Sequence, residues 1–322
     1  MSTSTERPAS TPSAARLLHL PRRPPAAVLT IAGLLVATTV RPPAVDAQAQ
    51  QRDVFVTVTD KDMKPVDTLE PADLLIKEDG VAREVIRVRR ATEPMQIALV
   101  VDNTQATNNH TSIIREALKG FVAELAGNRL SVIGFADRPT LLADATESVE
   151  DVTKRGIQRL FPQPDSGSYL LDAIVDSTKG FKKQEAPRPV IVAITFEGPE
   201  FSAAHHERAL EALKGSGAAL HVVTVGNHST DGIENEEVRS RNIVVDRGPR
   251  ETGGWHTNVL APQALGVGLT KIAKVLKSQF VATYGRPESL IPPEKLTVSS
   301  TRAGFEARGT FERPETKPKG SR

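Results

Sequence analysis

One apolar run in this sequence ends in residues that could carry chemistry. Residues 97–101 are Ile-Ala-Leu-Val-Val, and Asp102 and Thr104 follow in a short polar segment before a helical pattern begins near Thr111. Such a run is typical of a central strand in a covered parallel sheet, and these sheets bind ligands where their strands end. Carboxylate and hydroxyl oxygens are ligands that Mg²⁺ accepts, so Asp102 and Thr104 are the first candidates for a functional site.

Other polar clusters offer weaker chemistry. His205 and His206 are adjacent, about 100° apart on a helix, and so do not form the i, i+4 pair of a metal site. His228, Ser229 and Asp231 are the residue types of a hydrolase triad, but they share one short loop and no Gly-x-Ser-x-Gly elbow accompanies them. The sequence also lacks the glycine motifs of dinucleotide and nucleotide sites. For His228, Ser229 and Asp231, a polar turn is therefore favoured over an active site.

Composition limits the classes of function further. The chain has 322 residues, 39% hydrophobic and 25% charged, so it can bury a core and exceeds the size of one ordinary domain. Aromatic residues make up only 4%, which argues against a stacking platform for single-stranded nucleic acid. No cysteine is present, which excludes disulfides, thiol chemistry and cysteine-bound metals.

The first 47 residues have the order of a secretory signal. Arg16, Arg22 and Arg23 precede an apolar run at 26–40, and small residues lead to a cleavage point before Gln48. This run is about 15 residues long, shorter than the roughly 20 that a membrane helix needs, so an uncleaved anchor is the less favoured alternative. We therefore expect an exported protein, periplasmic, surface-held or secreted, with no membrane insertion beyond this signal.

The charge of the mature chain indicates no nucleic-acid partner. Removing residues 1–47 takes five Arg and two acidic residues from totals of 41 and 39, which leaves 36 basic and 37 acidic side chains. The basic excess therefore lies in the N-terminal segment, and the remaining chain is near neutral.

Two β segments flank a central region. In residues 48–92, valines alternate with other residues around 54–58, and an Asp-Gly turn joins the strands expected at 74–77 and 84–88. In residues 278–312, strands are expected at 280–284, 296–299 and 305–311. We expect the two segments to pair into one small β-sandwich, followed by a disordered tail at 313–322.

The central region, residues 93–277, alternates apolar strands with amphipathic helices. This order predicts a doubly wound, mostly parallel sheet with helices on both faces, of the Rossmann-like α/β class. The expected strands are 97–101, 130–135, 190–195 and 220–225, and the expected helices are 111–126, 149–160, 170–181, 202–213 and 262–276.

Four motifs in this order resemble the von Willebrand factor type A domain. The resemblance is greatest to secreted bacterial proteins in which one β segment precedes that domain and another follows. The motifs are VTVTDKDMKPVDTLEPADLLIKEDG at 57–80, IALVVDNTQA at 97–106, SGSYLLDAI at 166–174, and TGGWH at 252–256 leading into QFVATY at 279–284.

The resemblance implies a metal-ion-dependent adhesion site. In that family an Asp-x-Ser-x-Ser loop, a Thr from a second loop and an Asp from a third bind Mg²⁺, which then accepts a carboxylate from a partner protein. Asp102 matches the first Asp, Thr104 keeps a hydroxyl at the first Ser, and Ser168 stands at the position of the Thr.

Two positions depart from the pattern. Ala106 replaces the second Ser and has no donor oxygen. On the third loop, either Phe196 replaces the Asp or Glu197 reaches in from a register shifted by one. The sequence therefore predicts a degenerate site whose remaining candidate ligands are Asp102, Thr104, Ser168 and Glu197.

Together these observations favour an exported, non-enzymatic protein-interaction or adhesion module without a cofactor. Two alternatives stay open. The first is a working Mg²⁺-dependent adhesion site built from the four candidate ligands. The second is a hydrolase-type enzyme whose residues meet only in space, involving His228 or His256.

Overall fold

The computed structural model describes residues 49–226, 235–287 and 293–310. All of these residues belong to one compact unit by their internal contacts. The predicted N-terminal signal, the His228 cluster and the predicted C-terminal tail fall outside the described residues. Among the described residues, no helix combines the length and the apolar character needed to cross a membrane.

A six-stranded sheet forms the centre of the α/β domain. All its neighbouring strands run parallel except β7, which pairs antiparallel with β6 at one edge. The α/β class predicted from the sequence is therefore confirmed. In spatial order the strands are β10 (His256–Val259), β9 (Ala219–Val225), β8 (Pro189–Phe196), β5 (Gln96–Val101), β6 (Arg129–Gly134) and β7 (Thr140–Thr146).

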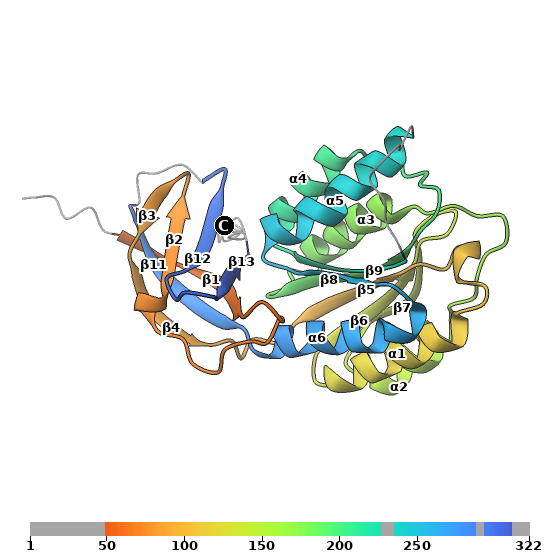
Figure 1. The fold of residues 1–322 in the computed structure, drawn as a ribbon, viewed down its shortest axis with the longest axis horizontal. Helices are drawn as coiled ribbons and strands as arrows, with labels where there is room; N and C mark the ends of the chain where they lie inside the picture. Colours follow the sequence, from red (N-terminus) through yellow and green to blue (C-terminus); the bar gives the residue numbers. More distant parts are fainter. Residues whose placement is uncertain (1–48, 227–234, 288–292, 311–322) are drawn as a thin grey trace, which may run out of the picture. The chain divides into compact units, whose positions relative to one another are not determined.

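Helices cover both faces of this sheet (Figure 1). Helices α1 (Thr111–Glu124) and α6 (Leu265–Lys277) lie on one face, and α3 (Leu170–Lys183), α4 (His206–Ser216) and α5 (Glu236–Thr252) lie on the other. Strand β5 is buried along its whole length because its alternate side chains enter two separate apolar clusters. Ile97, Leu99 and Val101 face α1 and α6, whereas Ala98 and Val100 face α3.

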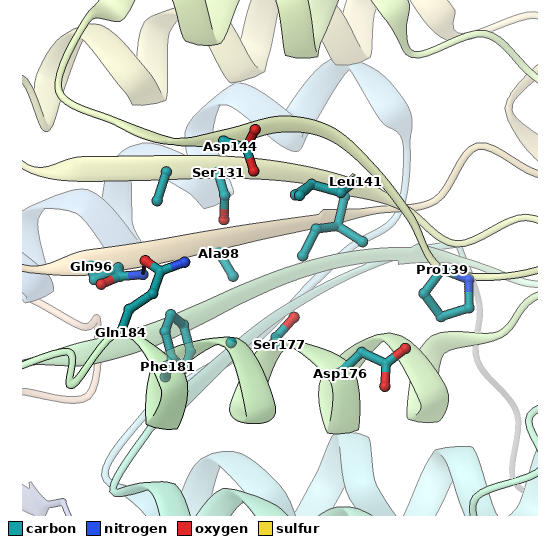
Figure 2. A pocket seen from close by; sticks show the side chains of 13 residues that line it. Gln96, Ala98, Ser131, Pro139, Leu141, Asp144, Asp176, Ser177, Phe181 and Gln184 are labelled. Carbon is teal, nitrogen blue, oxygen red and sulfur yellow. Dashed lines mark hydrogen bonds between the residues drawn. The ribbon is translucent and has the colours of Figure 1, made fainter.

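The second face carries a pocket. Helix α3 packs against β5 and β8. A pocket of about 260 Å³ lies between α3 and the strands β5, β6 and β7 (Figure 2).

Several elements differ from the sequence-based expectation. The helix expected at 149–160 is broken into α2 (Val149–Asp151), a π turn (Val152–Gly156) and a 3₁₀ turn (Ile157–Arg159). Helix α4 begins at His206 instead of 202, because the Asp172 carboxylate accepts hydrogen bonds from the backbone amides of Ala203 and Ala204 and holds that segment as a loop. The elements β7, α5 and β10 were not predicted.

The two β segments, one before and one after the α/β domain in the sequence, pair with each other. One sheet has the order β13 (Glu306–Gly309), β1 (Ala49–Thr59), β11 (Phe280–Pro287) and β4 (Val85–Arg90). The other joins β12 (Leu296–Ser300), β2 (Leu74–Glu78) and β3 (Val81–Arg83), with the predicted Asp-Gly turn between β2 and β3. Their side chains share one apolar cluster that includes Val56, Ile76 and Tyr284.

Arg188 binds both ends of the α/β domain. Its guanidinium donates hydrogen bonds to the backbone oxygens of Glu93 (3.1 Å) and Leu276 (2.7 Å), and its Nε donates to the Gln279 side chain (3.0 Å). Burial lowers the pKa of Arg188 to about 10. The segments that enter and leave the domain are thus held side by side.

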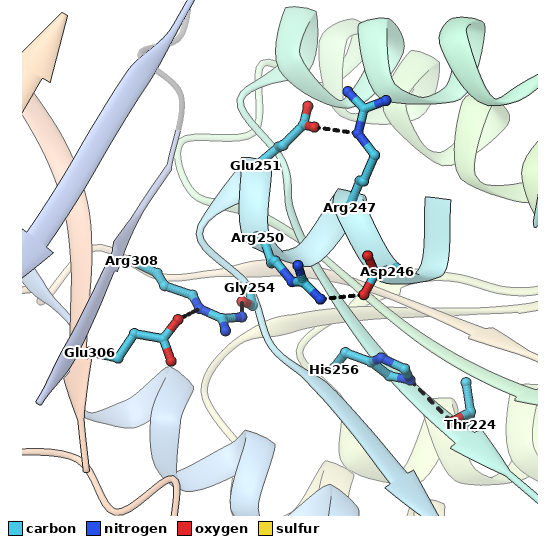
Figure 3. Close-up of polar contacts among 9 residues, drawn as sticks. All are labelled: Thr224, Asp246, Arg247, Arg250, Glu251, Gly254, His256, Glu306 and Arg308. Atoms are coloured by element: carbon cyan, nitrogen blue, oxygen red, sulfur yellow. Dashed lines mark hydrogen bonds and ion pairs between the residues drawn. The ribbon is translucent and has the colours of Figure 1, made fainter. Parts of the chain in front are cut away.

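The TGGWH motif is explained by close packing. Gly253 has φ +79°, and a Cβ at Gly254 would lie 1.8 Å from the carbonyl oxygen of Leu220. Arg308 donates a hydrogen bond to the Gly254 oxygen (2.7 Å, Figure 3), and its guanidinium lies 3.9 Å above the Trp255 ring. The motif therefore joins β10 to β9 and contacts β13, and Trp255 is a buried packing residue.

Candidate functional site at the carboxyl edge of the sheet

Asp102 follows β5 directly, and its side chain is fully engaged in backbone hydrogen bonds. One carboxylate oxygen accepts from the Thr104 amide and the other from the Phe196 amide, each at 2.9 Å. The residue is only 3% exposed, and burial raises the pKa of its carboxyl group, although these two hydrogen bonds act in the opposite direction. Asp102 therefore joins the loop after β5 to the end of β8.

The predicted loop after β5 is a tight turn. The Thr104 hydroxyl accepts a hydrogen bond from the Ala106 amide at 3.3 Å and caps the 3₁₀ turn Gln105–Thr107. The Ala106 methyl packs against the apolar cluster below. Asp102 and Thr104 thus lie together as the sequence indicates, but both stabilise the turn.

Ser168 pairs with a carboxylate that the sequence analysis did not consider. Its hydroxyl donates to Glu200 at 2.6 Å, and Ser202 donates to the other Glu200 oxygen. Glu200 is completely buried, and burial raises the pKa of its carboxyl group. Ser168 is therefore bonded to Glu200, not to Asp102 or Thr104.

Phe196 and Glu197, the two candidates on the third loop, have different surroundings. Phe196 is 6% exposed, belongs to the apolar cluster under α1 and stacks on the His110 ring with 6.1 Å between the ring centroids. Glu197 is exposed. An apolar ring therefore occupies the place that the family gives to a carboxylate.

A buried arginine supplies positive charge near these carboxyl groups. Arg241 of α5 is 3% exposed, and its Nη1 donates to the Gly198 carbonyl oxygen at 2.7 Å. Its charge acts on Glu200, Asp102 and Glu197, whereas burial lowers its own pKa. The site therefore contains a fixed cation of its own.

The side chains as placed do not fit an octahedral Mg²⁺ ion. Ala106 and Phe196 supply no oxygen, each Asp102 oxygen already accepts a backbone hydrogen bond, and the Ser168 hydroxyl is held against Glu200. No group of three or more His, Asp or Glu side chains within the described ranges could hold a metal ion. Mg²⁺ requires near-ideal geometry around hard oxygens, which this arrangement lacks.

Two exposed phenylalanines lie beside this site. Phe161 is 57% exposed, its backbone oxygen accepts from Asn103, and Arg115 lies 4.5 Å above its ring. Phe201 is 52% exposed, and its ring lies so close to Gly167 that a Cβ there would be 2.1 Å away. Each ring is therefore contacted by a neighbour on one side, and about half of its surface remains exposed.

Of the two histidines named for the enzymatic alternative, the structure describes His256. This residue has no carboxylate hydrogen-bond partner within the described residues. His256 lies on β10, and its Nε2 is 3.1 Å from the Thr224 hydroxyl (Figure 3). Among the described residues no Asp or Glu forms a hydrogen bond with its ring. The other candidate, His228, lies outside the described residues.

Sequence reasoning missed Glu200 and Arg241 because charged residues usually face solvent. The local sequence carries no signal for Glu200, because Phe201 and Ala203 close to it are exposed and the segment has no apolar run. Arg241 carries none either, because α5 itself was not predicted.

The parallel sheet with helices on both faces places the central region in the Rossmann-like α/β class. Residues 97–198 match a sequence model of the von Willebrand factor type A domain, and this part of the chain is such a domain. Domains of this family generally mediate protein–protein interactions. A search of curated proteins finds no match.

Solved structures with similar folds include three that differ in coverage. BatB from Bacteroides thetaiotaomicron is 17% identical, with a TM-score of 0.42 over 57% of this chain and 100% of that chain. A von Willebrand factor type A protein from Catenulispora acidiphila is 11% identical, with a TM-score of 0.45 over 82% and 74%. Proximal thread matrix protein 1 from the mussel byssus, in a structure with a zinc-occupied MIDAS motif, is 17% identical, with a TM-score of 0.48 over 62% and 50%. The chain thus spans about half of that mussel protein. These similarities concern the fold alone and indicate no ligand for this chain.

Proposed function

We propose that this protein is an exported, non-enzymatic interaction module that binds a partner protein at the carboxyl edge of its parallel sheet without a metal ion. The observation that carries the proposal is the pair of exposed rings, Phe161 and Phe201, beside the Asp102 turn. Aromatic residues are enriched in protein interfaces and supply much of their binding energy. In a chain with only 4% aromatic residues, two accessible rings at one edge favour a binding role.

The test is chemical cross-linking in an extract of the organism that encodes the protein, with and without chelator. We expect the wild-type protein to capture a partner in both conditions, and the double substitution Phe161→Ser with Phe201→Ser to lose it. The matched control is Val81→Ser with Ile86→Ser, which removes two apolar side chains of the β-sandwich that are 56% and 46% exposed. Capture that survives the loss of both phenylalanines would contradict the proposed surface.

The Mg²⁺-dependent alternative makes a separate prediction. It requires Asp102, Thr104, Ser168 and Glu197 to rearrange around an ion, so millimolar Mg²⁺ or Mn²⁺ would raise the melting temperature and chelator would reverse the rise. Under our proposal neither addition changes the melting temperature. The substitution Ala106→Ser should also produce no metal response, because one added hydroxyl does not replace the carboxylate missing at Phe196.

Export and the lack of catalysis belong to the same proposal. Export is supported by the order of residues 1–47, and we expect the mature protein to begin at Gln48, which N-terminal sequencing checks. The lack of catalysis is supported by the family and by the missing carboxylate partner of His256. Turnover in hydrolase or redox screens that Asp102→Ala abolishes would support the enzymatic alternative instead.

A further inference from the structure

The pocket on the α3 face exists because small side chains line the sheet and the helix there. Ala98 of β5 and Ser131 of β6 form part of its sheet side, and Ser177 and Gly180 of α3 lie opposite. On the same face, β8 and β9 carry the larger Ile191 and Leu220, which are buried in the apolar cluster shared with α3, α4 and α5. The volume of about 260 Å³ is below the usual range for drug-sized ligands, so it suits a group of roughly ten non-hydrogen atoms.

The pocket has an apolar interior and a hydrogen-bonded polar pair in its lining. Ile133, Leu141 and Phe181 supply apolar surface, and Leu141 is 55% exposed, which is unusual for a leucine that could be buried. At one end the Gln96 amide donates a hydrogen bond to the Gln184 side chain. A ligand with an apolar body would cover this surface and leave the glutamine pair intact.

The charges around the pocket have one sign. Asp144 of β7 and Asp176 of α3 both line it, and no Lys, Arg or His does (Figure 2). Within the described residues Asp144 has no hydrogen-bond or ion-pair partner. Asp176 pairs with Lys179 at 2.7 Å, but both side chains are more than half exposed, and such pairs contribute about 0–1 kcal/mol.

We propose that this pocket binds a small organic cation, an ammonium group on an apolar body about the size of one aromatic side chain. The apolar body lies against Ile133, Leu141 and Phe181, and the ammonium group lies beside Asp144, while Asp176 adds negative charge on the helix side of the pocket (Figure 2). This site is separate from the carboxyl edge and from its two exposed phenylalanines.

Three probes of one shape test the charge requirement on the full-length protein. Phenethylammonium, 2-phenylethanol and 3-phenylpropionate share a phenyl ring on a short chain and differ in charge. Titration calorimetry or saturation-transfer NMR should give the strongest binding for the cation and the weakest for the anion. The absence of binding by phenethylammonium, or equal binding by 3-phenylpropionate, would overturn the proposal.

Substitutions locate the site. Gly180→Leu should abolish phenethylammonium binding, because a Cβ there meets nothing within 4 Å and the side chain would fill the pocket. The matched control is Gly120→Leu in α1, where a Cβ also meets nothing within 4 Å, and binding should be unchanged. Binding by Gly180→Leu equal to that of the wild type would place the cation elsewhere and overturn the proposal.

Charge variants at exposed positions keep the test independent of folding. Asp144→Asn should lower the affinity for phenethylammonium by up to about fivefold, the range of an exposed ion pair, and leave the affinity for 2-phenylethanol unchanged. Lys179→Met should raise the affinity for phenethylammonium, because it removes the positive charge paired with the Asp176 carboxylate. If Asp144→Asn lowered the affinity for 2-phenylethanol as much as that for phenethylammonium, the charge of the carboxylate would not contribute to binding and the proposal would fail.

Discussion

At the scale of single residues, Arg241 is the feature that most alters the interpretation of the carboxyl edge. Asp102 and Glu200 are both buried there, and a buried carboxylate needs compensation by hydrogen bonds or opposite charge. Their hydrogen bonds come from Thr104, Phe196, Ser168 and Ser202, and the nearby positive charge comes from Arg241. A guanidinium thus supplies positive charge beside these two carboxyl groups.

Replacing this guanidinium should be costly in a pH-dependent way. Arg241→Met removes the hydrogen bond to Gly198 and leaves two buried carboxyl groups without the cation, so we expect a loss of roughly 2 kcal/mol or more in the free energy of unfolding at pH 7. The loss should shrink as the pH falls, because protonation of Asp102 and Glu200 removes the uncompensated charge. Denaturant titrations at pH 7 and pH 5 measure both effects.

The matched control is Arg239→Met, an exposed arginine on the same helix. Its substitution should change the free energy of unfolding by no more than about 0.5 kcal/mol. An equal loss in the two variants would show that the buried position of Arg241 has no special role.

His221 makes the molecule sensitive to acid. It is fully buried in β9, neither ring nitrogen has a hydrogen-bond partner among the described residues, and burial lowers its pKa to about 3. The unfolded chain binds this proton near pH 6.5, so the contribution of the neutral ring to stability is complete above that pH and is lost as the pH falls toward 3. His221→Leu should reduce the slope of stability against pH in this window by about one proton, as denaturation at several pH values would show. An unchanged slope would contradict this assignment.

At the scale of elements, the glycines before β10 determine whether that strand can join the sheet. A methyl group at Gly254 would overlap the Leu220 carbonyl oxygen, and this atom belongs to the backbone of β9. We expect Gly254→Ala to cost about 3 kcal/mol or more in stability, or to prevent folding. Thermal denaturation measures the loss. Gly266→Ala in α6, where the nearest atom to the new Cβ is 4.0 Å away, should be tolerated, and equal effects would contradict the packing argument.

The elements also show what sequence patterns could and could not reveal. Strands β5, β8 and β9 were predictable because burial on both faces requires continuous apolar runs, and α1 and α3 because one buried face requires a helical stripe. Helix α5 has no such stripe, since its buried residues include Ser240, Arg241 and Thr252, and Pro249 lies in its last turn. The edge strand β7 escaped prediction because it alternates poorly and pairs through two irregularities with β6.

The candidate site was partly predictable for the same physical reason. Asp102 and Thr104 follow an apolar run, which local sequence reveals. Glu200 and Arg241 reach the site through a loop after β8 and through α5, and their partners are distant in the sequence. Only the folded arrangement brings these charges near Asp102.

At the scale of the whole molecule, the α/β domain is inserted within the β-sandwich. Strands β1 and β11 hydrogen-bond as neighbours although Asp53 and Thr283, which meet there, are 230 positions apart in the sequence. In an unfolded chain, joining two segments so far apart carries a large loop-closure entropy. The folded α/β domain removes most of that cost, because Arg188 fixes the entering and leaving segments to the same place.

This insertion has a consequence for the order of folding. The sandwich should be the last part of the molecule to form and the first to open, since its central strand pair depends on an already folded insert. During synthesis, β1 must wait without its partner until more than two hundred further residues have been made and folded. A chain of this design leaves one strand edge unpaired for most of its folding, which makes that edge the natural contact for a folding assistant.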